Sequence, residues 1–303
     1  MPRAKIWRGL ESLSILPKIL NCLEGELFAT DCIFCAKTER ATLHNHEARA
    51  QLPNYKGRKI CSACACEIKQ TKTGNLLIAT QIPTQVPTQD LVQVLPYASL
   101  SPYEGKAKAL ILRLKTVKDE ALVMDLAKLL SQPLAVLLNY LYKDRLTDKP
   151  PLLVPVPLHE ARLKERGYNQ SELLARALAA ELPRLSGARP WTKSRKWKTQ
   201  PHWASPEKQY LAVGLLERVK CTESQQGLSM PQRSANMDGA FRLTAQPDGR
   251  PIIIIDDVLT SGATAGNCAA AIYSASCVDG RQITPGHSIK IGILTVARAR
   301  WRQ

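Results

Sequence analysis

The chain has 303 residues, more than the roughly 100 to 200 of one domain, so two folded units are expected. Its composition, 45% hydrophobic and 22% charged, is that of a globular protein and excludes a disordered or collagen-like chain. The 42 Lys and Arg against 26 Asp and Glu give a formal charge of +16, which favours polyanionic partners such as nucleic acid, phosphates or an acidic membrane surface.

Cysteine usage and apolar stretches indicate a cytoplasmic protein. The nine cysteines are an odd number, which fits reduced thiols and metal ligation better than a secreted disulfide framework. The apolar stretch near the N-terminus is interrupted by Glu11 and Pro17, so no signal peptide is expected. The longest apolar stretch, 121–142, contains Asp125 and Lys128 and therefore predicts an amphipathic helix rather than a transmembrane segment.

The elements in chain order predict a small module followed by an α/β domain. An amphipathic lead-in (1–30) precedes a module with paired cysteines (31–78), a Pro- and Gln-containing linker (79–90) and the main domain (91–303). Strands are predicted at 91–97, 151–156, 251–255 and 289–296, and helices at 106–115, 120–142, 169–182 and 264–274. This alternation is typical of a mostly parallel sheet flanked by helices.

A basic insertion is predicted at about 184–217. Between 184 and 220 the chain has nine Lys and Arg against two Glu. Aromatic side chains are interleaved with these charges: Trp191, Trp197, Trp203 and Tyr210. Such a composition suits single-stranded DNA, whose backbone is bound by charge and whose bases stack on aromatic rings. The alternative is a solubilising loop.

Two C-x2-C pairs predict a metal site. Cys32 and Cys35 form the first pair and Cys61 and Cys64 the second, which supplies the four thiolates of a tetrahedral, structural Zn²⁺ site. Cys66 could replace one ligand because it lies two residues beyond Cys64. Two histidines in the spacer, His44 and His46, are also candidates, although solvated loop histidines are the plainer interpretation.

The most informative stretch runs from 252 to 264. Four successive Ile residues predict a strand buried on both faces, whose carboxyl end carries Asp256 and Asp257 at the edge where open α/β sheets bind ligands. A turn of small residues then opens a helix, where backbone N–H groups and hydroxyls can surround a phosphate. The candidate residues are Asp256, Asp257, Val258, Leu259, Thr260, Ser261, Gly262, Ala263 and Thr264.

The two carboxylates constrain the ligand. Because they would repel a phosphate, they are expected to face vicinal sugar hydroxyls or a bridging Mg²⁺. A ribose 5-phosphate group satisfies both the acids and the turn. The alternative is a buried strand whose aspartates only cap the turn.

The stretch IIIIDDVLTSGAT resembles the phosphoribosyl pyrophosphate (PRPP) binding motif of type I phosphoribosyltransferases. More narrowly, the chain is similar to the ComF family of competence proteins, also called amidophosphoribosyltransferase-like proteins. This resemblance also covers the Cys pairs, 112–115, VPVPLHEARLKERGYNQSELL at 154–174 and RVKCTESQQGLSMPQRSANMDGAF at 218–241. It implies a type I phosphoribosyltransferase-like fold with N-terminal zinc knuckles. The insertion at 184–217 and another at 277–288 depart from the family pattern.

The resemblance implies roles for further residues. Asp256 and Asp257 would hold the ribose hydroxyls of Mg²⁺-bound PRPP, and the following turn would wrap its 5-phosphate. The loop with Pro157 and Leu158 would correspond to the pyrophosphate loop. Two nearby arginines, Arg162 and Arg166, have guanidinium groups that suit diphosphate oxygens, with a solvated helix face as the alternative. The family's flexible segment, which closes over the site, is matched by Gln225, Arg233 and Asn236; a surface loop without a catalytic role is the alternative.

Two hypotheses of function follow. In the first, the protein is a phosphoribosyltransferase that uses Mg²⁺ and PRPP on an unknown acceptor, with no general base identifiable. In the second, it is a non-catalytic, DNA-associated or PRPP-sensing protein, because fold does not decide function. The ComF resemblance implies a role in uptake of transforming DNA, with single-stranded DNA and competence-machinery proteins as partners.

Overall fold

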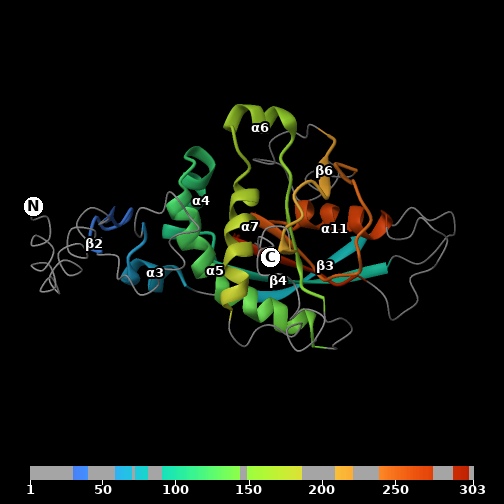
Figure 1. Cartoon of the computed structure of the whole chain (residues 1–303), viewed down its shortest axis with the longest axis horizontal. Coiled ribbons are helices and arrows are strands. Elements are labelled where there is room, and N and C mark those ends of the chain that lie inside the picture. Colours follow the sequence, from blue (N-terminus) through green and yellow to red (C-terminus); the bar gives the residue numbers. More distant parts are fainter. Residues whose placement is uncertain are drawn as a thin grey trace, which may run out of the picture.

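A computed structural model describes residues 30–39, 59–69, 72–80, 91–143, 149–185, 209–220, 239–275 and 289–299. Its centre is a five-stranded sheet (Figure 1). The strand order is β3 (Lys72–Thr80), β4 (Leu91–Pro102), β9 (Ile291–Arg298), β8 (Ile252–Leu259) and β5 (Leu152–Pro155). Neighbouring strands from β4 to β5 are parallel, and β3 is antiparallel to β4. The predicted α/β fold with a mostly parallel sheet is therefore confirmed.

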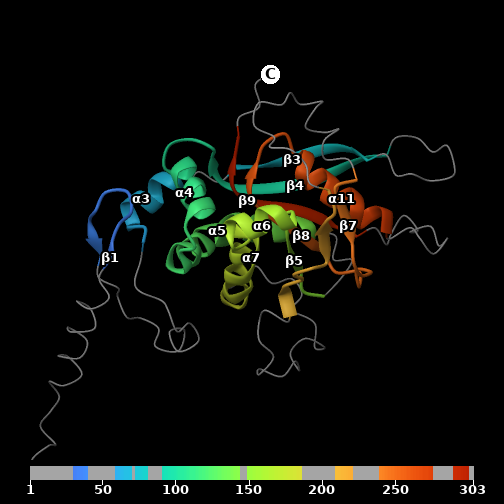
Figure 2. The same cartoon turned by 90° about the horizontal axis from the view of Figure 1, so that it is seen from above.

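Helices cover both faces of the sheet. On one face lie α4 (Gly105–Thr116), α5 (Glu120–Leu141) and α7 (Gln170–Glu181) (Figure 2). The other face is covered by α11 (Ala263–Ala275) and a small hairpin of β6 (Leu216–Arg218) and β7 (Phe241–Leu243). Strand β8 serves both layers, because Ile253 and Ile255 pack into the first and Ile252 and Ile254 into the second. The continuous apolar run of β8 thus places its carboxyl end between two layers of helices.

Helix α5 is a core helix. It has the length and the apolar composition that a membrane span needs, but most of its surface is buried inside the protein. Its side chains pack against α7, β4 and β9. Asp119 begins the helix by accepting a hydrogen bond from the Leu122 N–H at 3.1 Å. The predicted helix at 120–142 is therefore confirmed.

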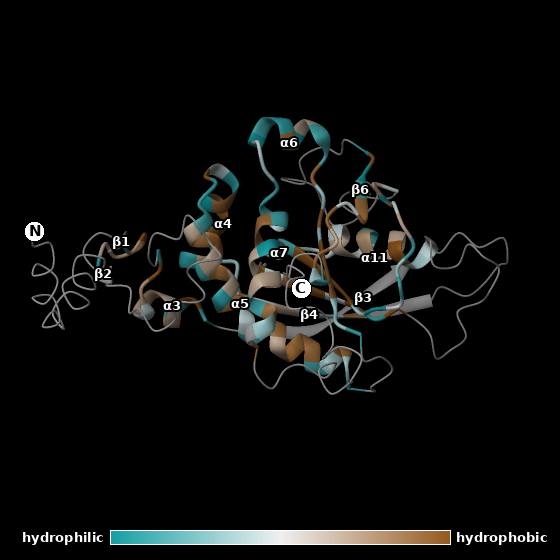
Figure 3. Ribbon diagram, in the orientation of Figure 1, coloured by the Kyte–Doolittle hydropathy of each residue, from teal (hydrophilic) through white to brown (hydrophobic). Residues whose placement is uncertain are grey.

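The remaining short elements lie around this domain. The cysteine-containing part consists of β1 (Thr30–Asp31), β2 (Thr38–Glu39) and α3 (Ser62–Ile68). A hydrophilic helix, α6 (Glu160–Arg166), stands out from the domain between β5 and α7 (Figure 3). A short 3-10 helix, Leu182–Arg184, follows α7.

Strand β3 was not among the strands predicted from the sequence, where 72–78 was placed in the cysteine module and 79–90 in a linker. The strand pairs with β4 from Lys72–Ser99 to Thr80–Leu91. Lys72, Gly74 and Asn75 interrupt its apolar pattern, so local periodicity does not indicate a strand here; pairing with β4, the next strand in the chain, defines it.

Candidate functional site

Two clusters of chemically active side chains lie at opposite ends of α4, and the first is the cysteine quartet. Cys32 and Cys35 lie in the turn between β1 and β2, where the Ala36 N–H donates to the Cys32 carbonyl at 2.9 Å. Cys61 caps α3, and Cys64 lies in the first turn of that helix. All four Sγ atoms lie within 4.8 Å of one another.

This arrangement fits a metal ion. Thiolates bound at about 2.3 Å to a tetrahedral ion lie about 3.8 Å from each other, and the Sγ atoms of Cys35 and Cys61 are 3.6 Å apart. Three of the four cysteines are buried, whereas Cys66 is exposed and does not belong to the cluster. The four predicted cysteines could therefore hold a structural metal. His44 and His46 lie outside the described residues.

The pKa values of the Cys32 and Cys64 thiols are shifted in opposite directions. Burial acts to raise the pKa of Cys32, but backbone N–H groups, that of Cys61 foremost, outweigh it and lower the pKa to about 6. Burial raises the pKa of Cys64 to about 12, and the neighbouring thiols add to this rise. Four thiolates in one site repel each other unless a cation compensates them. A bound divalent cation would compensate the negative charge of these thiolates.

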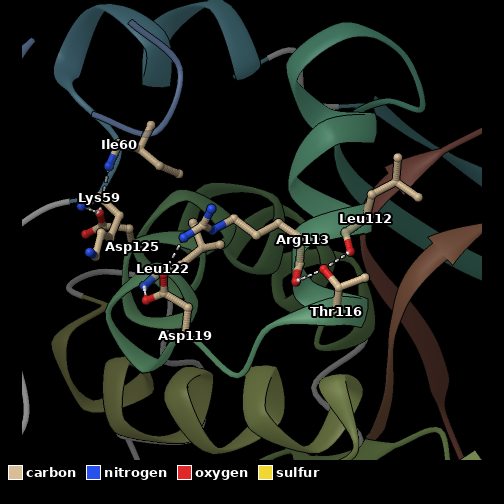
Figure 4. A network of polar contacts seen from close by, with 8 residues as sticks. All are labelled: Lys59, Ile60, Leu112, Arg113, Thr116, Asp119, Leu122 and Asp125. Carbon is tan, nitrogen blue, oxygen red and sulfur yellow. Dashed lines mark hydrogen bonds and ion pairs between the residues drawn. The ribbon is translucent and has the colours of Figure 1, made fainter. Parts of the chain in front are cut away.

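Hydrogen bonds attach the cysteine module to the main domain. The buried carboxylate of Asp125 on α5 accepts the N–H groups of Lys59 and Ile60 at 2.7 and 3.1 Å (Figure 4). Lys106, near the start of α4, donates to the Cys64 Sγ at 3.3 Å and to Glu67 at 2.6 Å. Contacts of this kind orient metal ligands from outside the coordination sphere.

The second cluster lies at the carboxyl end of β8. The Asp256 Oδ1 atom accepts hydrogen bonds from the Ser171 hydroxyl at 3.2 Å and from the Asp257 N–H at 2.9 Å. The Asp257 carboxylate forms an ion pair with Lys115 at 2.9 Å. Burial, and after it the negative charge of Asp257, raises the pKa of Asp256 to about 8. The two adjacent acids therefore have different partners.

The turn after β8 shares a small pocket with Asp256. Gly262 has a φ of 82°, a left-handed conformation that favours glycine, and the Gly266 N–H donates to its carbonyl as α11 begins. The Ser261 hydroxyl accepts a long hydrogen bond from the Ala263 N–H at 3.4 Å. The pocket is lined by Asp256, Val258, Leu259, Thr260, Gly262, Thr264, Ala265, Ile293 and Thr295. Of the predicted residues, Asp257, Ser261 and Ala263 do not line it.

The predicted pyrophosphate loop leads into α6. Pro157 and Leu158 are half-buried between β5 and this helix. Arg162 is exposed and pairs with Glu165 at 3.2 Å, and Arg166 donates to Gln170 at the start of α7. Arg166 thus lies closer than Arg162 along the chain to Ser171 and its contact with Asp256. Gln225, Arg233 and Asn236 lie outside the described residues.

Comparison with known proteins identifies relatives. The chain is 30% identical over 224 residues to the DNA utilization protein YhgH of Escherichia coli O6:H1, a match that covers 69% of this chain and 82% of the relative. It is 29% identical over 219 residues to the protein of the same name in Salmonella typhimurium, with the same coverage. It is 30% identical over 118 residues to competence protein F of Haemophilus influenzae, covering 38% of this chain and 41% of that protein. The chain belongs to the ComF family. No protein-family model matches it.

In this ComF-family protein, the segment 167–171 forms hydrogen bonds to neighbouring elements beside the candidate site. These bonds were not predicted from the sequence. The Tyr168 hydroxyl donates to the Leu114 carbonyl at 2.8 Å, and the Asn169 side chain donates to the Val156 carbonyl at 3.0 Å. Asn169 also caps α7 by accepting the Ser171 N–H. These bonds connect α4, the residue that follows β5 and the start of α7 beside Asp256. The only local signal was the capping residue before an apolar helix.

One residue of the basic insertion was assigned wrongly. Tyr210 is 6% exposed and packs in the core beside α5 and α7, so its ring is not available for stacking on bases. The Arg250 guanidinium also holds the Gln209 carbonyl at 2.8 Å, and Leu211 bridges to β5. Residues 209–220 therefore belong to the folded domain. Trp191, Trp197 and Trp203 lie outside the described residues.

Proposed function

We propose that this ComF-family protein binds PRPP with Mg²⁺, or a related ribose 5-phosphate ligand, at the carboxyl end of β8. The observation that carries the proposal is the pocket that Asp256 shares with Thr260, Gly262 and Thr264. It lies where parallel strands end and a helix begins, which is the usual position for phosphorylated ligands in open α/β sheets.

Different residues of the pocket bind different parts of the ligand. The hydroxyls of Thr260 and Thr264 and the N–H groups of the turn bind the 5-phosphate, and Gly262 lets the backbone approach it closely. Asp256 accepts hydrogen bonds from ribose hydroxyls, held in place by Ser171. Bound Mg²⁺ would neutralise charge on the diphosphate of PRPP.

The same pocket serves either of two activities. One is transfer of the phosphoribosyl group to an acceptor, in which positioning and electrostatics supply the rate enhancement. The other is PRPP sensing without transfer. The +16 charge and the ComF relatives favour an acceptor or partner among nucleic acids. Pyrophosphate release in the presence of candidate acceptors distinguishes transfer from sensing.

Calorimetric titration with Mg²⁺ and PRPP tests the pocket. The double variant Asp256→Ala with Asp257→Ala is expected to abolish binding while the circular dichroism of the fold is retained. Glu120→Ala, which removes an exposed acid at the start of α5, is the control and should bind like the wild type. Unchanged affinity in the double variant would falsify the assigned pocket.

The cysteine quartet is proposed to hold one structural Zn²⁺. Cys32, Cys35, Cys61 and Cys64 would bind it, since four soft thiolate ligands favour Zn²⁺ and leave no open coordination position for a substrate. The bound ion would lower the thiol pKa values and fix β1, β2 and α3 to each other. Four reduced thiols in one site also support the proposed cytoplasmic location.

We also propose that the protein acts in DNA utilization or in uptake of transforming DNA, as the names of its relatives suggest. Competence-machinery proteins are proposed as partners, and single-stranded DNA is the proposed ligand of the insertion. Because Tyr210 is buried, the test removes 191–208 and keeps the folded residues after it. The deletion should weaken retention of single-stranded DNA and flatten the dependence of log K on log salt. A deletion variant with the wild-type salt slope would exclude this surface.

A further inference from the structure

Helix α4 presents one cation to the two acids of the candidate site. The Lys115 Nζ lies 2.9 Å from the Asp257 Oδ2, and the Asp257 side chain is only 7% exposed, whereas that of Lys115 is 35% exposed. Asp256 instead receives the Ser171 hydroxyl and lines the pocket of the turn. Although the acids are adjacent in sequence, only Asp256 belongs to the pocket lining.

The position of Lys115 is set by neighbouring contacts. The Tyr168 hydroxyl donates to the carbonyl of Leu114, the residue before Lys115, and so holds the last turn of α4. Tyr168 itself precedes Asn169, whose side chain bonds to the Val156 carbonyl next to β5. The last turn of α4, which carries Lys115, is therefore held by a bond from the segment that precedes α7.

We propose that Lys115 is a positioning residue that holds the Asp257 carboxylate toward α4 and compensates its charge, leaving Asp256 as the acid that contacts a ribose 5-phosphate ligand. This inference rests on the proposed function of the pocket and assigns the two acids unequal roles within it. Asp257 acts through its ion pair with Lys115, whereas Asp256 contacts the ligand directly.

Electrostatics explains why such a cation is needed. An anionic phosphate approaches a turn that directly follows two carboxylates, and each uncompensated carboxylate in a poorly solvated position opposes it. Lys115 offsets part of the negative charge of Asp257 at close range. Loss of the cation should therefore weaken ligand binding, and removal of the Asp257 charge should restore it.

Titration with Mg²⁺ and PRPP across a set of variants tests the inference. Lys115→Met is expected to weaken binding about fivefold to tenfold, the size of one charge-assisted contact that is partly screened by solvent. Lys118→Met is the matched control, because it removes the same charge from an exposed residue whose ion pair with the exposed Glu120 is long, at 4.0 Å. It should bind like the wild type.

Two further variants separate positioning from general damage to the fold. Lys115→Arg should restore binding to within about twofold, because a guanidinium can hold the same carboxylate. Lys115→Met combined with Asp257→Asn should bind more tightly than Lys115→Met alone, since the charge that Lys115 compensates is removed as well. A merely structural loss would not be reversed by removing a second buried group.

The outcomes distinguish this inference from the function on which it rests. If the wild type binds PRPP and Lys115→Met binds it with the same affinity, the role of Lys115 is overturned while the proposed function of the pocket stands. An Asp256→Asn variant that binds like the wild type, beside an Asp257→Asn variant that does not bind, would reverse the assignment of the two acids. If the wild type binds no PRPP at all, both the proposed function and the inference fail.

Discussion

The contact between Asp125 and the second cysteine pair gives a quantitative prediction. In Asp125→Ala, the N–H groups of Lys59 and Ile60 lose the carboxylate that accepts them at 2.7 and 3.1 Å. A hydrogen bond to a charged group contributes about 1.5 to 3 kcal/mol, and Lys59 is partly exposed, so water replaces part of its bond. We expect the cysteine module to lose about 3 kcal/mol of stabilisation against local opening, about a hundredfold in its opening equilibrium.

Hydrogen exchange measured on peptides from 59–69 is the assay. Exchange at these amides should accelerate about a hundredfold in Asp125→Ala when opening is fast relative to exchange. Asp119→Ala is the control on the same helix, because it removes the N-cap of α5 but no bond to the module. It should cost about 1 kcal/mol of helix stability and leave 59–69 protected. Unchanged protection in Asp125→Ala would refute the docking role of this carboxylate.

Three further predictions concern the metal site and the turn. Metal analysis should find one zinc per chain in the wild type and in Cys66→Ser but none stably bound in Cys64→Ser; equal loss in both variants would contradict the assigned quartet. Asp256 keeps its proton in the folded state up to about pH 8 and loses it near 3.8 when unfolded, so the free energy of unfolding should fall as pH rises through that window. Urea titrations at several pH values should show that Asp256→Asn removes this contribution to the slope. Gly262→Ala should lower stability by about 1 kcal/mol in the same titrations, because a side chain is strained at its φ of 82°; an unchanged midpoint would contradict this.

Local patterns in the sequence predicted most of the central domain. The four Ile residues of β8 and the apolar spacing of α5 and α7 determine secondary structure by themselves, because each buries a face that its own periodicity defines. Strand β3 was missed because Lys72, Gly74 and Asn75 interrupt its apolar pattern, and its pairing with β4 is what defines it. Thus elements that depend on a partner were the ones that the sequence concealed.

The candidate sites were predictable to a different extent. The spacing of the cysteine pairs indicated all four members of the cluster, since two residues between thiols allow both to approach one ion. The roles of Asp125 and Lys115 could not be predicted, because their partners are far away in sequence. The partners of Asp125 lie 65 and 66 residues away, and Lys115 of α4 pairs with Asp257 of β8. No periodicity encodes which distant helix faces a given carboxylate.

Helix α4 joins the two clusters, and this has a consequence for binding. Lys106 near its start contacts Cys64 and Glu67, and Lys115 near its end contacts Asp257, about 14 Å further along the helix axis. Loss of metal would release Cys64 and loosen the start of α4, so the end of the helix would hold Asp257 less well. We therefore expect chelation of the metal to weaken binding of PRPP about threefold, within the 0.5 to 2 kcal/mol typical of such coupling.

Lys106→Met provides the matched test, because it breaks the link between α4 and the cysteine cluster without removing a metal ligand. In this variant zinc content should stay at the wild-type level, and chelation should no longer change the affinity for PRPP by the same factor. If chelated wild-type protein remains folded and binds PRPP with unchanged affinity, the two clusters are independent. The cysteine module would then stabilise the fold without acting on the pocket.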